Sequence, residues 1–144
     1  MRVFAALALV AATTVACGGI GMFRQYEYEE DMYLSLDGRA TLYVNTSVAA
    51  LDALRGASFD TNPDAAVDRD RVREYFSSPV THVTRVTTWR RSNRRFVQVR
   101  IDVGDVTRLA EAKPFAWSTY QFKRDGASDL FLYLQTVGAA ARKE

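Results

Sequence analysis

The chain has 144 residues, of which 48% are hydrophobic and 25% are charged, and its formal net charge is +2. This length and composition predict a single globular domain and exclude a disordered chain, and a charge so close to zero argues against a nucleic-acid-binding protein. With one cysteine and one histidine, the chain has neither an internal disulfide nor a zinc cluster.

The amino terminus has the pattern of a secretory signal. Arg2 is followed by an uncharged run, VFAALALVAATTVA, and then by Cys17. A bilayer-spanning helix needs roughly 18 to 20 apolar residues, whereas the apolar core of a signal peptide has about 7–15. A span that continued through CGGIGMF would include three glycines, which are poor helix formers. We therefore expect a signal peptide over residues 1–16, with a transmembrane anchor as the alternative.

The residues around Cys17 allow a more specific interpretation. TTVACGG, residues 13–19, resembles the lipobox of bacterial lipoproteins, although Thr14 stands where those proteins usually have leucine. The resemblance implies cleavage before Cys17, a diacylglyceryl group on its thiol and an acylated (palmitate-type) new amino terminus. An ordinary signal peptide with an incidental cysteine is the alternative.

The same resemblance implies a location. The protein would be anchored in a bacterial cell envelope on the periplasmic, extracytoplasmic side. Gly18 replaces the aspartate that often retains such proteins in the inner membrane, which favours the outer membrane. Residues 17–25 would then be a lipidated, flexible tether.

The expected folded domain spans residues 26–138 and begins with a hairpin. Apolar residues occupy alternate positions in YEYEEDMYLSLD and again in RATLYVNT, on either side of Asp37-Gly38. Matching the apolar faces predicts a three-residue loop, Asp37-Gly38-Arg39, with Gly38 in the left-handed region. The predicted pairs are Leu36 with Ala40, Leu34 with Leu42 and Met32 with Val44.

Two short helices are predicted next. SVAALDALRG would be capped by Ser47 and ended by Gly56, and DRDRVREYFSSP would be capped by Asp68 and ended by Pro79. The side chains expected to face inward are Val48, Leu51 and Leu54 in the first helix and Val72, Tyr75 and Phe76 in the second.

A second hairpin is predicted from VTHVTRVTTW and RFVQVRIDV. A turn at Ser92-Asn93 pairs Val86 with Val99, and it pairs Trp89 with Phe96 on the face opposite the valines. In this register His82, the only histidine, lies opposite Val103 on the face of Val86, where we expect a packed or hydrogen-bonded side chain.

The chain ends with a third helix and a third hairpin. DVTRLAEAKP is capped by Asp105 and closed by Pro114. In the final hairpin, a loop at Asp125-Gly126-Ala127 pairs Phe122 with Leu130 and Tyr120 with Leu132. Residues 139–144 are expected to be a disordered tail. The prediction is an α+β fold with one antiparallel sheet of about six strands in three hairpins, and two or three short helices on one face.

Three groups of side chains are candidates for function. The carboxylates of EYEEDMY could collect calcium, but strand spacing favours a solvated face and no metal is expected. The arginines around the second turn could contact lipid headgroups or an acidic partner, or keep the hairpin tip soluble. These are Arg90, Arg91, Arg94 and Arg95.

The third group is a set of aromatic residues predicted to lie opposite the aliphatic face of their strands. A second apolar face indicates a groove, a protein interface, or cover by the chain's own loops. The set comprises Tyr33, Tyr43, Trp89, Phe96, Trp117, Phe131 and Tyr133.

These features predict a non-catalytic, lipid-anchored envelope protein that needs no cofactor and binds a lipid-like ligand or an envelope partner. The lipobox, the LSLDG hairpin and the order of elements resemble LppM-type lipoproteins, whose α+β domain is linked to lipid-like ligands. A structural or assembly component of an envelope complex is the alternative. A concave apolar pocket would favour the ligand, and a flat open patch would favour assembly. An enzyme would require a polar cleft that brings His82 together with two carboxylates.

Overall fold

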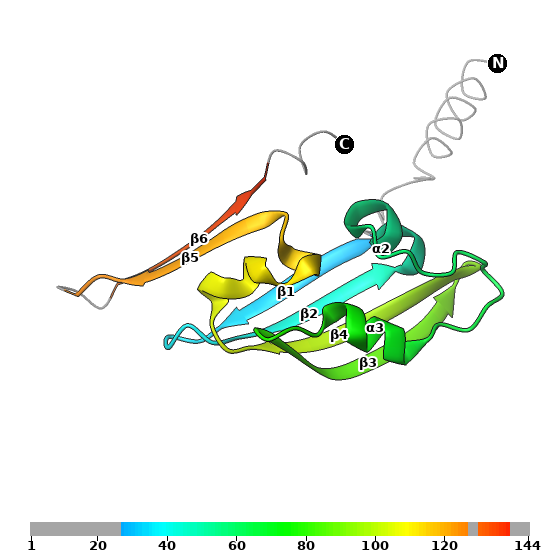
Figure 1. Ribbon diagram of the computed structural model, residues 1–144, viewed down its shortest axis with the longest axis horizontal. Helices are drawn as coiled ribbons and strands as arrows, with labels where there is room; N and C mark the ends of the chain where they lie inside the picture. The colour runs from blue at the N-terminus through cyan, green and yellow to red at the C-terminus, as the bar shows by residue number, and fades with distance from the viewer. Residues whose placement is uncertain (1–26, 127–129, 139–144) are drawn as a thin grey trace, which may run out of the picture.

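The computed structural model describes residues 27–126 and 130–138 (Figure 1). The predicted signal peptide, Cys17, the tether over residues 17–25 and the tail over residues 139–144 lie outside the described residues. They remain sequence-based predictions.

The six strands form two antiparallel sheets. β1 (Tyr28–Leu34), β2 (Ala40–Ser47), β3 (Thr81–Arg91) and β4 (Arg94–Val103) form a four-stranded sheet in the order β1-β2-β4-β3. β5 (Ser118–Arg124) and β6 (Phe131–Val137) form a separate two-stranded ribbon. The α+β class and the three hairpins are confirmed, but the single sheet is wrong. The ribbon packs on the rest of the molecule through side chains and does not extend the hydrogen-bonded ladder (Figure 1).

Short helical segments cover one face of the four-stranded sheet (Figure 1). They are α2 (Val48–Arg55), α3 (Arg69–Phe76) and the 3₁₀ helices η1 (Val106–Glu111) and η2 (Lys113–Phe115). The hydrophobic core lies between this layer and the sheet. The strands contribute Leu42, Val44, Val97, Val99 and Ile101, and the helices contribute Leu51, Val72, Phe76, Leu109 and Phe115.

The predicted caps Ser47, Gly56 and Asp68 are confirmed, whereas the second helix ends at Phe76 and not at Pro79. The Ser47 hydroxyl accepts a hydrogen bond from the Ala50 N–H at 3.0 Å, and Gly56 ends α2 with φ +60°. The Asp68 carboxylate accepts from the first N–H groups of α3. Leu54 was expected to face inward, but its side chain is 45% exposed, so this part of the prediction is wrong. The predicted third helix is two 3₁₀ segments that are separated at Ala112, whose backbone is extended, and Pro114 lies in the second segment.

The first hairpin has a longer connection than predicted. Leu34 pairs with Ala40 and Met32 with Leu42, so residues 35–39 form the loop and Leu36 is exposed. Gly38 has φ +84°, as predicted. A shift of two residues keeps every side chain on its face, so matching faces could not distinguish the two registers.

The second hairpin matches the prediction at its turn. Ser92 and Asn93 both have positive φ, as a two-residue type I′ turn requires. The pairs Val86–Val99 and Trp89–Phe96 are confirmed. The register shifts between Val83 and Arg85, at a β-bulge.

This bulge corrects the position of His82. The histidine pairs with Asp102 and not with Val103, and it is exposed. The extra residue beyond Val83 moves His82 to the opposite face of the strand, away from the core. The prediction that His82 lies opposite Val103 on the face of Val86, as a packed or hydrogen-bonded residue, is therefore wrong.

The third hairpin has a different register, and this moves its aromatic residues. Phe122 pairs with Tyr133 and Tyr120 with Gln135, three positions from the predicted partners. An odd shift reverses the faces of one strand relative to the other. Phe131 and Tyr133 therefore share a face with Tyr120 and Phe122, not the opposite face.

Candidate functional site

The four-stranded sheet has a face turned away from the helices, which we call the open face. A shallow hollow of about 460 Å³ lies on it and crosses β1, β2 and β4. We call it the tyrosine hollow. It is lined by Asp31, Tyr33, Thr41, Tyr43, Asn45, Gln98 and Arg100.

Two tyrosines and an arginine give this hollow its chemistry. The rings of Tyr33 and Tyr43 meet edge to face, with centroids 5.7 Å apart, and Tyr33 is 65% exposed. The Arg100 guanidinium carbon lies 5.9 Å from the centre of the Tyr43 ring. Such a surface can stack on a flat or extended ligand and hold it by cation–π contact.

Polar side chains make up the rest of the lining. Asn45 and Gln98 are cross-strand neighbours, and Asp31 lies opposite Tyr43. Amide and carboxylate groups can donate to and accept from the polar backbone of a partner. The hollow is therefore a mixed aromatic and polar surface and not an enclosed apolar cavity.

A second aromatic pair lies on the open face near the β3–β4 turn. The rings of Trp89 and Phe96 are stacked at 5.5 Å with an interplanar angle of 13°. Phe96 is buried, whereas Trp89 is 39% exposed. Of the seven aromatic residues predicted to share a face, four lie on the open face as two separate pairs, Tyr33 with Tyr43 and Trp89 with Phe96.

The other three predicted aromatic residues lie elsewhere. Trp117 packs on the Arg55 guanidinium. Phe131 stacks on Phe122 with centroids 5.8 Å apart, and Tyr133 packs against the core. The prediction of one continuous aromatic face is wrong, because it assumed a single sheet and a different register for the third hairpin.

Arg55 joins the ribbon to the rest of the fold, and this cluster was not predicted. Its guanidinium carbon lies 4.3 Å from the Tyr28 ring centre and 3.9 Å from the Trp117 ring centre. It also pairs with Glu30 at 3.6 Å, and both side chains are largely buried. Burial and the Glu30 carboxylate raise the pKa of Tyr28 above its ordinary value. No local pattern connects these residues, since they come from β1, α2 and the start of the ribbon.

Most of the arginines of the second hairpin have partners within the fold. Buried Arg95 donates to the carbonyls of Asp60 and Ala65, and Arg90 donates to Asp64 and Ala65 at 2.8 and 3.1 Å. Both therefore hold the loop between α2 and α3.

The other two arginines differ from each other. Arg94 forms an ion pair with Glu27. Among the described residues, the Arg91 side chain has no hydrogen-bond or ion-pair partner. Of the four arginines, it is the one whose cation is not used within the described fold.

A second hollow, of about 640 Å³, surrounds His82. We call it the histidine hollow. It brings His82 near two carboxylates, the arrangement that an enzyme would require. Its other polar side chains come from the ends of β3 and β4 and from η1. The polar lining comprises Arg39, Ser78, Thr81, His82, Asp102, Asp105 and Arg108.

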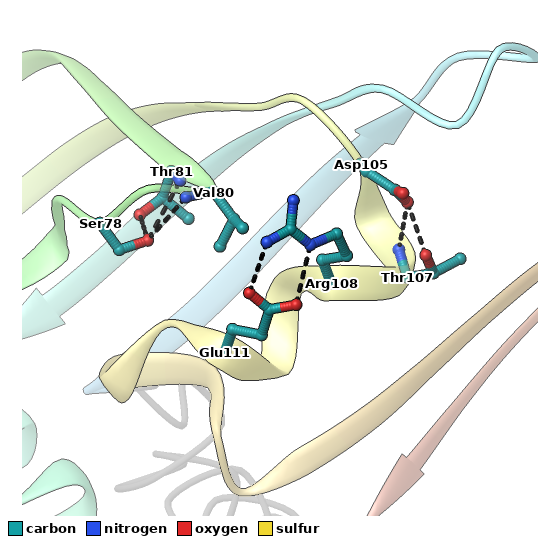
Figure 2. Close-up of polar contacts among 7 residues, drawn as sticks. All are labelled: Ser78, Val80, Thr81, Asp105, Thr107, Arg108 and Glu111. Carbon is teal, nitrogen blue, oxygen red and sulfur yellow. Dashed lines mark hydrogen bonds and ion pairs between the residues drawn. The ribbon is translucent and has the colours of Figure 1, made fainter.

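The polar groups of this hollow are engaged in local contacts (Figure 2). Asp105 accepts from the N–H and hydroxyl of Thr107 at 2.9 and 2.7 Å, and these bonds lower the pKa of Asp105. Arg108 forms two 2.8 Å bonds to Glu111, which lower the pKa of that carboxyl.

The histidine does not join this network. Asp102 accepts from the Thr41 hydroxyl at 3.2 Å, and the Ser78 hydroxyl lies 2.8 Å from that of Thr81. Within residues 27–126 and 130–138, the His82 side chain forms no hydrogen bond. The hollow has the residue types of an acid–base site without a nucleophile bonded to a base.

Two further properties concern the described residues. No three histidine, aspartate or glutamate side chains there are placed to share a metal ion. No helix within these ranges is long and apolar enough to cross a bilayer.

Comparisons with protein-family models, curated proteins and solved structures find no match to this chain.

Proposed function

We propose that this protein is a non-catalytic, lipid-anchored accessory component of the bacterial cell envelope, and that its open face binds an envelope protein. The observation that carries the proposal is the composition of that face. Tyr33, Tyr43, Trp89 and Arg100 lie on one open surface, and tyrosine, tryptophan and arginine dominate the binding energy of protein interfaces.

The shape of the tyrosine hollow favours a protein over a lipid chain. A site for an acyl chain is concave and mainly apolar. The hollow is shallow and includes Asp31, Asn45 and Gln98, which suit the polar groups of a protein surface. A lipid-like ligand is the second candidate, supported by the exposed Tyr33 ring beside Tyr43.

The histidine hollow has the residues that the sequence analysis required of an enzyme, and the non-catalytic part of the proposal relies on the local contacts that already engage its polar groups. A general base must be within hydrogen-bond reach of the proton that it removes and must be oriented by a partner. Asp105 and Arg108 are turned to Thr107 and Glu111 (Figure 2), and His82 is exposed on an edge strand.

The anchor is proposed from the lipobox resemblance at Cys17. Fully extended, the tether over residues 17–25 would span at most about 30 Å. The open face would therefore stay close to the membrane surface and meet partners in or near it.

Metabolic labelling with a clickable fatty acid tests the anchor. We expect label on the wild-type chain and none on Cys17→Ser. Equal labelling of both chains, or of neither, would contradict the anchor and leave the open-face proposal standing.

Photo-cross-linking in cells tests the open face. A photoreactive amino acid at Thr41, beside the two tyrosines, should give one defined protein adduct, and the same group at exposed Glu74 on α3 should not. A chain that carries the Thr41 probe together with Tyr43→Ala and Arg100→Ala should lose the adduct. Its midpoint of thermal unfolding should differ by no more than a few degrees from that of the chain with the probe alone.

The same samples distinguish the two candidates. A stoichiometric lipid that co-purifies with the wild-type chain and is lost in Tyr43→Ala would favour the lipid-like ligand. Equal adducts from the Thr41 and Glu74 probes would contradict a specific open-face interface.

A further inference from the structure

The outer strand of the ribbon, β6, has an edge that no described strand covers. β6 pairs with β5 on one side, and the two strands make up the whole of their sheet. Of the two strands of the ribbon, β5 is the one that packs against η1, so β6 is the outer strand. Figure 1 shows the ribbon extending beyond the body of the molecule. A two-stranded ribbon by itself is only marginally stable in water.

The hydrogen bonds at the two ends of the ribbon show which backbone groups are free. The Asp125 N–H donates to the Leu130 carbonyl at 3.0 Å, and the Gly138 N–H donates to the Trp117 carbonyl at 2.7 Å. Bonded and non-bonded pairs alternate along an antiparallel ladder. In this register, Leu132, Leu134 and Thr136 therefore direct their backbone groups to β5.

The residues between them direct their backbone N–H and C=O groups to the open edge of β6. These are Phe131, Tyr133, Gln135 and Val137. These four alternate residues each offer a backbone donor and a backbone acceptor to a further strand.

The composition of β6 is unusual for an edge strand. Proteins protect open edges with charged residues, proline or bulges. β1 contains Glu29, Glu30 and Asp31, β3 contains three arginines, and β5 contains Lys123 and Arg124. β6, with sequence FLYLQTV, has none of these protections. The other uncharged strand, β2, is paired on both sides.

The outward face of β6 is also apolar. Leu132 is 57% exposed and Leu134 is 45% exposed, and Leu130 next to the strand is 68% exposed. The strand therefore has the sequence of an interior strand, whereas its position leaves both an edge and a leucine row uncovered.

We propose that β6 pairs antiparallel with β6 of a second copy of this chain across a two-fold axis. In antiparallel self-pairing a residue at the two-fold axis faces its own counterpart, and the residues on either side of the axis face each other, so a strand with charges of one sign would bring like charges together. β6 has no charge to oppose this. The pairing joins two ribbons into a four-stranded sheet and places the leucines of both copies side by side on one face. This inference is independent of the open face, which lies on the other sheet.

Sedimentation of the full chain, purified in detergent, tests the pairing over a range of concentrations. We expect a monomer–dimer equilibrium for the wild type. Gln135→Pro removes an outward N–H without touching the β5–β6 ladder, and it should raise the dissociation constant roughly tenfold or more. Gln135→Ala, which loses the same side chain but keeps the N–H, should dimerise like the wild type.

A second pair of variants separates folding from association. Leu134→Lys places like charges at the pairing edge and should weaken the dimer, whereas Gln121→Lys places the same charge directly across on β5 and should not. A wild-type chain that stays monomeric at all concentrations, or a Gln135→Pro variant that dimerises like Gln135→Ala, would overturn the proposal. In the Cys17→Ser chain, which lacks the proposed anchor, binding to liposomes that is lost in Leu134→Lys but kept in Gln135→Pro would assign the leucine row to a membrane and overturn the proposal too.

Discussion

At the scale of single residues, the structure depends on a few backbone positions and caps. Ser47, Asp68 and Asp105 each accept hydrogen bonds from the N–H groups of the turn that follows. Gly38 and Gly56 have positive φ, which other residues adopt at a cost. These positions are predictable because each depends on residues within a few places along the chain.

Replacing Gly38 tests the cost of its backbone conformation. Gly38→Ala should lower the free energy of unfolding by about 1–2 kcal/mol, because φ is +84°. An added Cβ would lie 3.4 Å from the Phe122 ring, which is ordinary contact. Urea denaturation measures the change. Gly104→Ala, at a position with open space and no positive φ, is the control and should change stability by less than about 0.5 kcal/mol.

The hydrogen bonds of the Asp105 cap should be detectable in the titration of the Asp105 carboxyl. Its carboxyl is held at a lowered pKa by Thr107, so its contribution to stability is present at neutral pH and is lost as the pH falls through that lowered pKa. Thr107→Val removes the hydroxyl donor and should move the Asp105 pKa back towards its ordinary value. Carboxyl NMR titration measures this, and an unchanged pKa would contradict the assigned cause.

At the scale of elements, the second hairpin forms half of the four-stranded sheet and also binds the loop between α2 and α3 through its arginines. Its turn is local and was predicted from Ser92-Asn93, as was the Trp89–Phe96 pair. Its arginines, however, were expected to face solvent, lipid or a partner, whereas Arg90 and Arg95 bind carbonyls of the preceding loop. That loop lies far away in sequence, so spacing within the hairpin does not indicate the contact.

Removing the Arg95 guanidinium should therefore destabilise the fold. Arg95→Met removes the side-chain donor to the Asp60 carbonyl and one of the two arginine donors to the Ala65 carbonyl, and it should cost about 2–3 kcal/mol of unfolding free energy. Arg91→Met in the same hairpin is the matched control and should change it by no more than about 0.5 kcal/mol. Thermal and urea denaturation measure both variants. Equal effects would show that Arg95 acts through general charge and not through the loop.

At the scale of the whole molecule, the two sheets are connected by packing and not by strand pairing. Arg55 is central to this connection, since it stacks between Tyr28 of β1 and Trp117 at the start of the ribbon. Its ion pair with Glu30 lies in the same buried cluster. The ribbon can therefore loosen without breaking the β1-β2-β4-β3 ladder.

Substitution of Arg55 should release the ribbon first. Arg55→Met removes two cation–π contacts and leaves Glu30 unpaired, with an expected loss of about 2–4 kcal/mol. Arg55→Lys keeps the charge but not the planar stacking group and should recover only part of the loss. In hydrogen exchange, amides of β5 and β6 should become faster than those of β4. A uniform increase over all strands would contradict a local role.

The sequence by itself determined the features that depend on near neighbours. The Ser92-Asn93 turn, the caps, the left-handed Gly38 and the alternation of strand faces all arise from local backbone chemistry and side-chain period. Only the tertiary structure decided the division of six strands into two sheets, the bulge that moves His82 and the register that separates Phe131 and Tyr133 from the open face. The reason is physical: a shift of two residues preserves faces and an odd shift reverses them, and the choice between registers depends on loops and packing partners distant in the chain. Arg55 and Arg95 are the clearest cases, because their partners are brought to them only by the fold.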